Sequence, residues 1–290
     1  PGWLTDLGQP GMDPQTFMDI ATVVTKLKMY PYFDIAHYAL MCMMVREDAP
    51  QTGTAIFSRK HPLACWVSSM LLCFAGNLIA NFLLGEAVLT PFKSHEALVL
   101  ASIVWYFINY SPFDLVYKIA RFLPFKIILY MLKEVQRTKK IFDGVTIAAK
   151  LYPGSYIVIV LIGIVKGECE VKGMLERVVR GLWIPGTNEF LQPSFTTKAS
   201  FLSAVVFVLE REKYLTAPHA LIYFGVVMFL IYFKLSSLLL GIHDPFVPFE
   251  NLFCAVFMGG MWDALKRNLV KKLKSLSEKR HMNMKKYQFH

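Results

Sequence analysis

A run of basic residues lies inside an otherwise apolar stretch of this chain. Lys126, Lys133, Arg137 and Lys140 follow one another at helical spacing, which places them within roughly 60° on one face of an α-helix. Two cations one turn apart, such as Lys133 and Arg137, can hold a phosphate group, because Arg offers a fork of donors and Lys a point charge. The spacing predicts a helix face that serves a water-filled path, an anionic partner or a lipid headgroup.

The depth of these cations in a membrane helps to choose among these roles. If the helix starts near Pro124 on the cytosolic side, Lys133 lies roughly 13 Å deep at ~1.5 Å per residue. Snorkelling toward the headgroups explains Lys126 and Lys140 better than Lys133 and Arg137. An anionic phosphoinositide is the expected ligand of the inner pair. A charge that crosses the membrane field also contributes about 2.3 kcal/mol per 100 mV, so voltage sensing is a second role for it.

The composition indicates a membrane protein. Hydrophobic residues make up 55% of the 290 residues, and the mean hydropathy is +0.42. Residues 62–85, 97–113 and 215–233 carry no Lys, Arg, Asp or Glu, and such runs are too long for a soluble core. The five cysteines are scattered, which argues against a disulfide scaffold. The dispersed histidines predict no metal site, and no catalytic motif is present, so we expect no enzyme.

We expect an all-α polytopic membrane protein with seven transmembrane helices. The expected spans cover residues 29–45, 62–85, 97–113, 122–142, 151–165, 198–210 and 214–240. The segment 246–262 is short for a span, so we interpret it as an interfacial helix, with an eighth span as the alternative. The greater number of Lys and Arg on the side of the C-terminus predicts a cytosolic C-terminus and a lumenal or extracellular N-terminus.

The spans also suggest an internal repeat of three helices. Residues 95–105 align without gaps with residues 197–207, the first and fourth spans begin at Pro31 and Pro124, and the second and fifth contain Gly76 and Gly163. Repeats with an odd number of spans must be inverted, an architecture common in permeation pathways. The predicted regions are a lumenal N-terminal segment (1–28), the first repeat (29–113), the second repeat (114–212), the seventh helix (213–241), the interfacial segment (242–263) and a basic cytosolic tail (264–290).

Three further residues are candidates for a pore. Gly76 and Gly163 have two explanations, a kink that shapes a pore and close helix packing, and the sequence leaves both open. Asp34 would face water in a cation path, whereas an internal hydrogen bond or ion pair is the alternative for it and for His37, nearly one turn away.

Six short motifs, spread from about residue 30 to 250, resemble one family. The segment 133–140, KEVQRTKK, is similar to the KEVxRxxK segment of the trimeric intracellular cation channels of the endoplasmic and sarcoplasmic reticulum. The other five follow in the same order as in that family. They are PYFDIA at 31–36, CFAG at 73–76, WY at 105–106, TNE at 187–189 and TKAS at 197–200. The chain is identified as an invertebrate-like member on this pattern.

The resemblance implies a homotrimer with one pore in each subunit, built from two inverted three-helix repeats plus a seventh helix. It implies a potassium and monovalent cation channel of the reticulum membrane that supplies counter-ion current for calcium release. It further implies that Lys133 and Arg137 contact phosphatidylinositol 4,5-bisphosphate as a bound lipid, with no organic redox cofactor and no nucleic acid. Lys126, Lys140 and Gly76 are further candidates for contact with the lipid or pore. Two alternatives remain, a secondary transporter and a non-conducting phosphoinositide-binding scaffold.

Overall fold

The structure, a computed structural model, describes residues 14–47, 58–167, 195–241, 244 and 246–257, together with positions 266, 267 and 270. The regular elements in these ranges are all helices, which confirms the predicted all-α class for the described part of the chain. The motif at 187–189, most of the tail from 264 and the first residues of the N-terminal segment lie outside the described residues. Residues 1–243 and 244–290 form separate units, so each is described by itself.

A helix overlaps each of the seven expected spans, with ends that differ by several residues for some of them. The helices of the first unit are α1 (Pro14–Thr25), α2 (Tyr32–Glu47), α4 (Pro62–Leu84), α5 (His95–Tyr110), α6 (Leu115–Arg121), α7 (Leu123–Leu151), α8 (Tyr156–Lys166), α10 (Phe195–Arg211) and α11 (His219–Leu240), with 3₁₀ turns η1 (Thr90–Lys93) and η2 (Pro112–Asp114). Helices α1 and α6 were not expected. In the second unit, α12 (Val247–Phe257) falls within the segment predicted to be interfacial.

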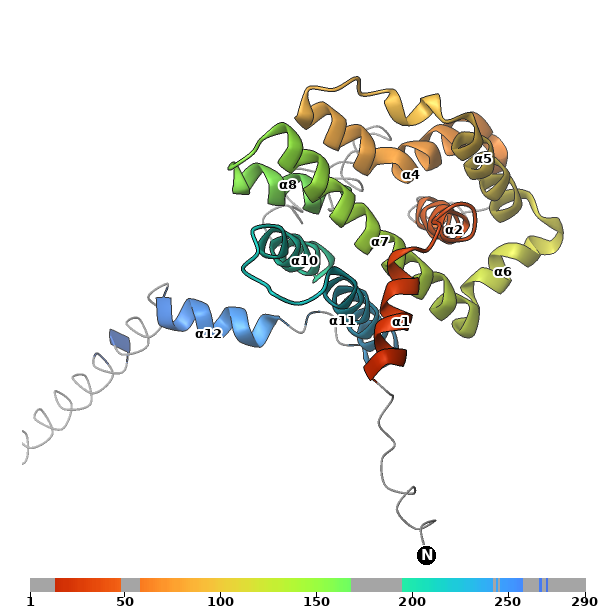
Figure 1. The fold of residues 1–290 in the computed structure, drawn as a ribbon. Coiled ribbons are helices and arrows are strands. Elements are labelled where there is room, and N and C mark those ends of the chain that lie inside the picture. Colours follow the sequence, from red (N-terminus) through yellow and green to blue (C-terminus); the bar gives the residue numbers. More distant parts are fainter. Residues whose placement is uncertain are drawn as a thin grey trace, which may run out of the picture. The chain divides into compact units, whose positions relative to one another are not determined.

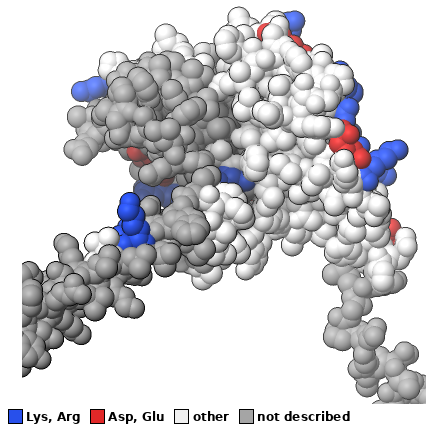
Figure 2. Space-filling model, turned by 90° about the vertical axis from the view of Figure 1, so that its left-hand side faces the viewer, with Lys and Arg blue, Asp and Glu red and all other residues white. Residues whose placement is uncertain are grey.

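In the part of the chain that the structure describes, two helices, α4 and α11, are long and apolar enough by themselves to cross a membrane. Helix α5 and the segment Pro112–Arg121, which meet at a bend of 89°, would make a third span if they count as one. The other expected spans are shorter or, in α7, interrupted by charge, so the number of seven spans stays a prediction. On the face shown in Figure 2, uncharged residues cover most of the described surface, and Lys, Arg, Asp and Glu gather mainly at its margins.

Helix α7 lies at the centre of the helix packing. It contacts α2 on one side and α8, α10 and α11 on the other (Figure 1). Helices α2, α4 and α5 all contact one another, and so do α7, α8 and α10. The two groups meet where α2 packs on α7 and α4 on α8. The predicted repeat pairs these same helices, the first with the fourth and the second with the fifth.

Buried apolar side chains fill the first three-helix group. Its cluster includes Tyr38, Met41, Leu72, Phe74 and Ile108, all at most 6% exposed. Because lipid tails are as apolar as these side chains, the packing of such a core in a membrane depends on close van der Waals contact rather than on exclusion of water.

Helices α7 and α8 approach so closely that glycine is required where they cross. A Cβ added at Gly163 would lie 2.9 Å from Cγ2 of Val145 and 3.1 Å from Cβ of Ala204. A Cβ added at Gly144 would lie 3.1 Å from the Cα of Gly163. Of the two explanations that the sequence left open for Gly163, these contacts support close helix packing. Its part in a kinked pore helix stays a prediction.

We expect Gly163→Ala to lower the stability of the protein by about 1 to 3 kcal/mol, because overpacking forces the two helices apart. Gly225→Ala in α11 is the matched control, since nothing lies within 4 Å of an added Cβ there. Alanine in a helix is favoured over glycine by roughly 0.5–1 kcal/mol, so the control should not lose stability. Thermal unfolding in detergent measures both, and equal losses would contradict the close contact.

Candidate functional site

One face of α7 carries a line of polar side chains through the centre of the helix packing. Lys133, Gln136, Arg137, Lys140 and Asp143 follow each other at helical spacing, within roughly 120° around the axis. We call these five residues the α7 polar face. From residue 133 to 143 the line is about 15 Å long, at ~1.5 Å per residue. The polar face therefore extends over about half the thickness of a bilayer core.

The two predicted phosphate-binding cations lie inside the protein. Lys133 is 5% exposed and Arg137 3%, and Glu134 between them is completely buried. Nη1 of Arg137 lies 2.8 Å from Oε2 of Glu134, one turn away on the same helix. The sequence analysis did not anticipate this ion pair. A phosphate that reached Arg137 would have to share the guanidinium with Glu134 or replace its carboxylate.

Helix α2 reaches the polar face through Asp34. The amide nitrogen of Gln136 donates a hydrogen bond to the Asp34 carboxylate across the α2–α7 contact. Lys140 is also close enough to Asp34 to interact with its charge. His37, completely buried, uses Nε2 to donate to the carbonyl oxygen of Cys73 at 3.0 Å. Asp34 and His37 thus each make an internal hydrogen bond, as the alternative explanation predicted, but to different helices.

A polar cavity of about 350 Å³ continues the line beyond Lys140. It lies between α4, α7 and α8. Its lining residues are Asn77, Lys140, Asp143, Thr146, Ile147 and Lys166. Nζ of Lys139, which does not line the cavity, lies 3.2 Å from the Asp143 carboxylate. The cavity combines two amines with one carboxylate, an amide and a hydroxyl, so it can hold water and hydrated ions rather than an apolar ligand.

The structure brings some sequence candidates together and leaves others apart. Lys133, Arg137, Lys140 and Asp34 gather around the polar face, and Gly76 is buried in α4 next to the cavity residue Asn77. Lys126 lies in the first turn of α7, half-buried. Within the described ranges, no three His, Cys, Asp or Glu side chains are arranged to bind a metal ion.

Five polar residues of this site were missed. They are Asn77, Gln136, Asp143, Thr146 and Lys166. Asp143 follows Lys140 by three residues, so helical spacing places it on the same face. It was missed because only basic residues were considered as members of that face. Gln136 obeys the same spacing. Asn77 and Lys166 come from other helices, and only the packing of α4 and α8 on α7 brings them to the cavity.

Loss of the buried carboxylate should destabilise the protein. We expect Glu134→Gln to cost about 3 to 5 kcal/mol, because it leaves Arg137 buried without its counter-charge. Asp143→Asn is a matched control on the same helix, since its pair with Lys139 is 35% to 45% exposed and worth less than about 1 kcal/mol. Thermal unfolding measures both, and a Glu134→Gln protein as stable as the control would show that the pair contributes little.

This chain is similar in sequence and in fold to proteins of one known family. Residues 51–241 match the family model described as TRIC channel. The trimeric intracellular cation channel type 1B.1 of Caenorhabditis elegans is 54% identical over 260 residues, which cover 89% of this chain and 88% of that protein. A solved trimeric intracellular cation channel from C. elegans, determined in the absence of Ca²⁺, has a TM-score of 0.75 and 51% identity, covering 80% of this chain and all of that one. A TRIC counter-ion channel studied for its activity in calcium release has a TM-score of 0.70 and 34% identity, covering 77% of this chain and 99% of that one. On the family model and this identity, the chain belongs to the TRIC channel family.

Proposed function

We propose that this chain conducts potassium and other monovalent cations along the α7 polar face. The observation that carries the proposal is the polar cavity between α4, α7 and α8, which continues the line of polar groups from Asp34 and Gln136. Charged and amide side chains are costly in a membrane and persist where they line a water-filled path. If the seven spans form two inverted three-helix repeats followed by a seventh helix, this line lies at the junction of the two repeats. Such folds bind and pass ions at that junction.

The carboxylates and amines have different tasks in this path. Asp34 and Asp143 attract cations. On the polar face, Lys140 lies between Gln136, which binds Asp34, and Asp143. Lys140 and Lys166 keep either carboxylate from binding a cation so strongly that it cannot leave, since conduction requires weak sites. A monovalent ion suits such a path, because the described cavity has one carboxylate rather than the several oxygens that divalent ions prefer.

We further propose that Lys133 and Arg137 bind the phosphates of an anionic phosphoinositide. The Arg137 guanidinium can donate to phosphate oxygens beside or in place of Glu134, and Lys133 adds a second charge one turn away. Binding there would alter the charge at one end of the polar face. The same buried cations make the current sensitive to voltage when they move within the field.

The expected assembly and setting follow the relatives. Those relatives are named trimeric cation channels, and one is described as a counter-ion channel in calcium release. We therefore propose a homotrimer in the endoplasmic or sarcoplasmic reticulum, with one path per subunit, that balances charge during calcium release. The proposed orientation is a lumenal N-terminus and a cytosolic C-terminus.

Single-channel recording in planar bilayers tests the path. In asymmetric KCl we expect unitary currents that reverse near the potassium equilibrium potential. Asp143→Asn should lower the cation conductance, and more strongly at about 0.1 M than at 1 M salt, because the screening length falls from about 10 Å to about 3 Å. Asp19→Asn is the matched control, an exposed acid on α1 away from the polar face. Equal conductance in both variants would remove Asp143 from the path.

Lipid binding tests the proposed phosphoinositide site at Lys133 and Arg137. Arg137→Lys keeps the charge but loses the fork of donors, so we expect it to weaken binding of phosphatidylinositol 4,5-bisphosphate without loss of the folded trimer. Lys133→Gln with Arg137→Lys should weaken it further and change the conductance. Lys26→Gln/Lys28→Gln serves as the control, because both lysines are exposed outside the polar face. Lipid retained by the purified trimer, measured by native mass spectrometry, gives the result, and equal retention in all variants contradicts the clamp.

The recordings also separate the two alternative functions. Saturable, substrate-dependent flux without unitary currents would favour a secondary transporter. Lipid binding by well-folded trimers that pass no current at any voltage or lipid composition would favour a non-conducting scaffold.

A further inference from the structure

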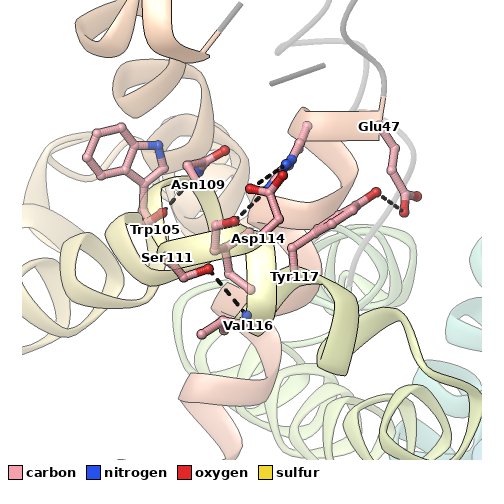
Figure 3. A network of polar contacts seen from close by, with 9 residues as sticks. Glu47, Trp105, Asn109, Ser111, Asp114, Val116 and Tyr117 are labelled. Atoms are coloured by element: carbon pink, nitrogen blue, oxygen red, sulfur yellow. Dashed lines mark hydrogen bonds and ion pairs between the residues drawn. The ribbon is translucent and has the colours of Figure 1, made fainter. Parts of the chain in front are cut away.

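The bend between α5 and α6 is held by a buried arginine of α2. Arg46 is 4% exposed, and its Nη1 donates to the carbonyl oxygen of Ile108 at 2.6 Å. Its Nη2 lies 3.1 Å from the Asp114 carboxylate, and its guanidinium carbon lies 4.0 Å from the centre of the Tyr117 ring. One side chain thus contacts the end of α5, the turn η2 and the helix α6. Figure 3 shows Asp114 and Tyr117 within the network of polar contacts at this bend.

Further contacts make the bend a defined structure. The backbone N–H of Val116 donates to Oγ of Ser111 at 3.2 Å, and the Tyr117 hydroxyl donates to Glu47 at 3.3 Å (Figure 3). Phe113 and Asp114 have φ values of 55° and 56°, a backbone conformation that residues other than glycine adopt only where the surroundings impose it. The direction of α6 relative to α5 is therefore set by the fold. If α5 crosses the membrane, a bend of 89° directs α6 along the membrane surface.

The surface of α6 divides into three sectors around the helix axis. Val116, Tyr117 and Ala120 face the protein and pack on the core of the first three-helix group. Leu115, Ile119 and the following Phe122 occur at helical spacing and are 58%, 42% and 61% exposed. The exposed Lys118 and Arg121 flank this apolar stripe on the side away from the core. Phe113 in the turn before α6 is 93% exposed.

We propose that α6 docks on the surface of the bilayer as an interfacial anchor that binds anionic lipid headgroups. An apolar stripe beside basic residues, on a helix that runs along the membrane plane, is the pattern of helices that bury one face at the acyl boundary. Leu115, Ile119 and Phe122 enter the acyl region, while Lys118 and Arg121 lie at headgroup level. The occupant is the lipid surface, because the basic flank complements the anionic leaflet that the predicted topology places there.

This inference rests on the proposed membrane-spanning orientation of α5, but not on conduction. The anchor is separate from the proposed clamp at Lys133 and Arg137, which are buried, whereas Lys118 and Arg121 are exposed. It requires no particular headgroup. Any negatively charged lipid should bind, because flexible surface cations recognise charge rather than the arrangement of phosphates.

Spin labels on single cysteines test the position of α6. The full chain, with Cys169 and Cys254 replaced by serine and the buried Cys42, Cys65 and Cys73 retained, is reconstituted in vesicles of phosphatidylcholine with phosphatidylserine, so that the introduced cysteine is the one exposed to the label. Labels at Leu115→Cys, Ile119→Cys and Phe122→Cys should collide more often with oxygen than with a water-soluble nickel complex. A label at Lys26→Cys, an exposed position outside the helix packing, gives the aqueous reference.

Two results would overturn the anchor. Labels on the apolar stripe that are as accessible to nickel as the reference place α6 in water. Labels shielded from both reagents place it against protein, such as a second copy of the chain. Labels at Val99→Cys and Phe107→Cys, on the exposed face of α5, separate these failures from a wrong topology, because only a wrong topology makes them aqueous too.

The basic flank is tested by lipid retention. Lys118→Gln/Arg121→Gln should lower the affinity of the α6 surface for phosphatidylserine by about fivefold for each charge, as expected for about 1 kcal/mol per basic residue at an anionic surface, so that fewer lipids stay bound to each trimer. Lys93→Gln/Lys150→Gln is the matched control, with the same charge change at exposed lysines elsewhere. Native mass spectrometry counts the bound lipid, and equal losses in the two variants would contradict binding at α6.

Discussion

Burial of charge on α7 is the constraint on which the rest of this structure depends. Lys133, Glu134 and Arg137 are all at most 5% exposed in the middle of the helix packing. Buried charges destabilise a fold unless they are paired or reach water. The ion pair between Arg137 and Glu134 meets this demand within α7, and the hydrogen bond between Gln136 and Asp34 meets it across to α2. The neighbouring helices must therefore supply polar groups as well as apolar surface.

The close contact of α7 and α8 works together with this constraint. Where Gly144 and Gly163 let the backbones approach, van der Waals packing holds the two helices together without polar groups. Directly beside this contact, Asp143 and Lys166 face the cavity with Asn77 of α4. A tight apolar crossing and a polar cavity thus lie next to each other on the same pair of helices.

The α5–α6 bend shows a second way to place charge in a membrane protein. Arg46 is buried, but it binds a carboxylate, a carbonyl oxygen and an aromatic face at once. Its guanidinium thereby joins three elements, and it fixes the backbone rather than lining a path. The cations of α6 itself are exposed. The surroundings of a basic side chain therefore decide its role. Arg46 holds the backbone of the bend, whereas the proposed roles of Lys118 and Lys140 are contact with lipid headgroups and lining of the ion path.

The sequence by itself determined the helical class, the positions of the helices at the expected spans and the family, because apolar run length, helical spacing and short motifs are local properties. It also found Lys133, Arg137 and Lys140 on one face, since that face is a matter of period alone. It did not reveal the Arg137–Glu134 pair, the bend held by Arg46, or the cavity formed with Asn77 and Lys166. These depend on side-chain direction and on helices far apart in the chain, so only the tertiary structure decided which buried charges meet and which open onto water.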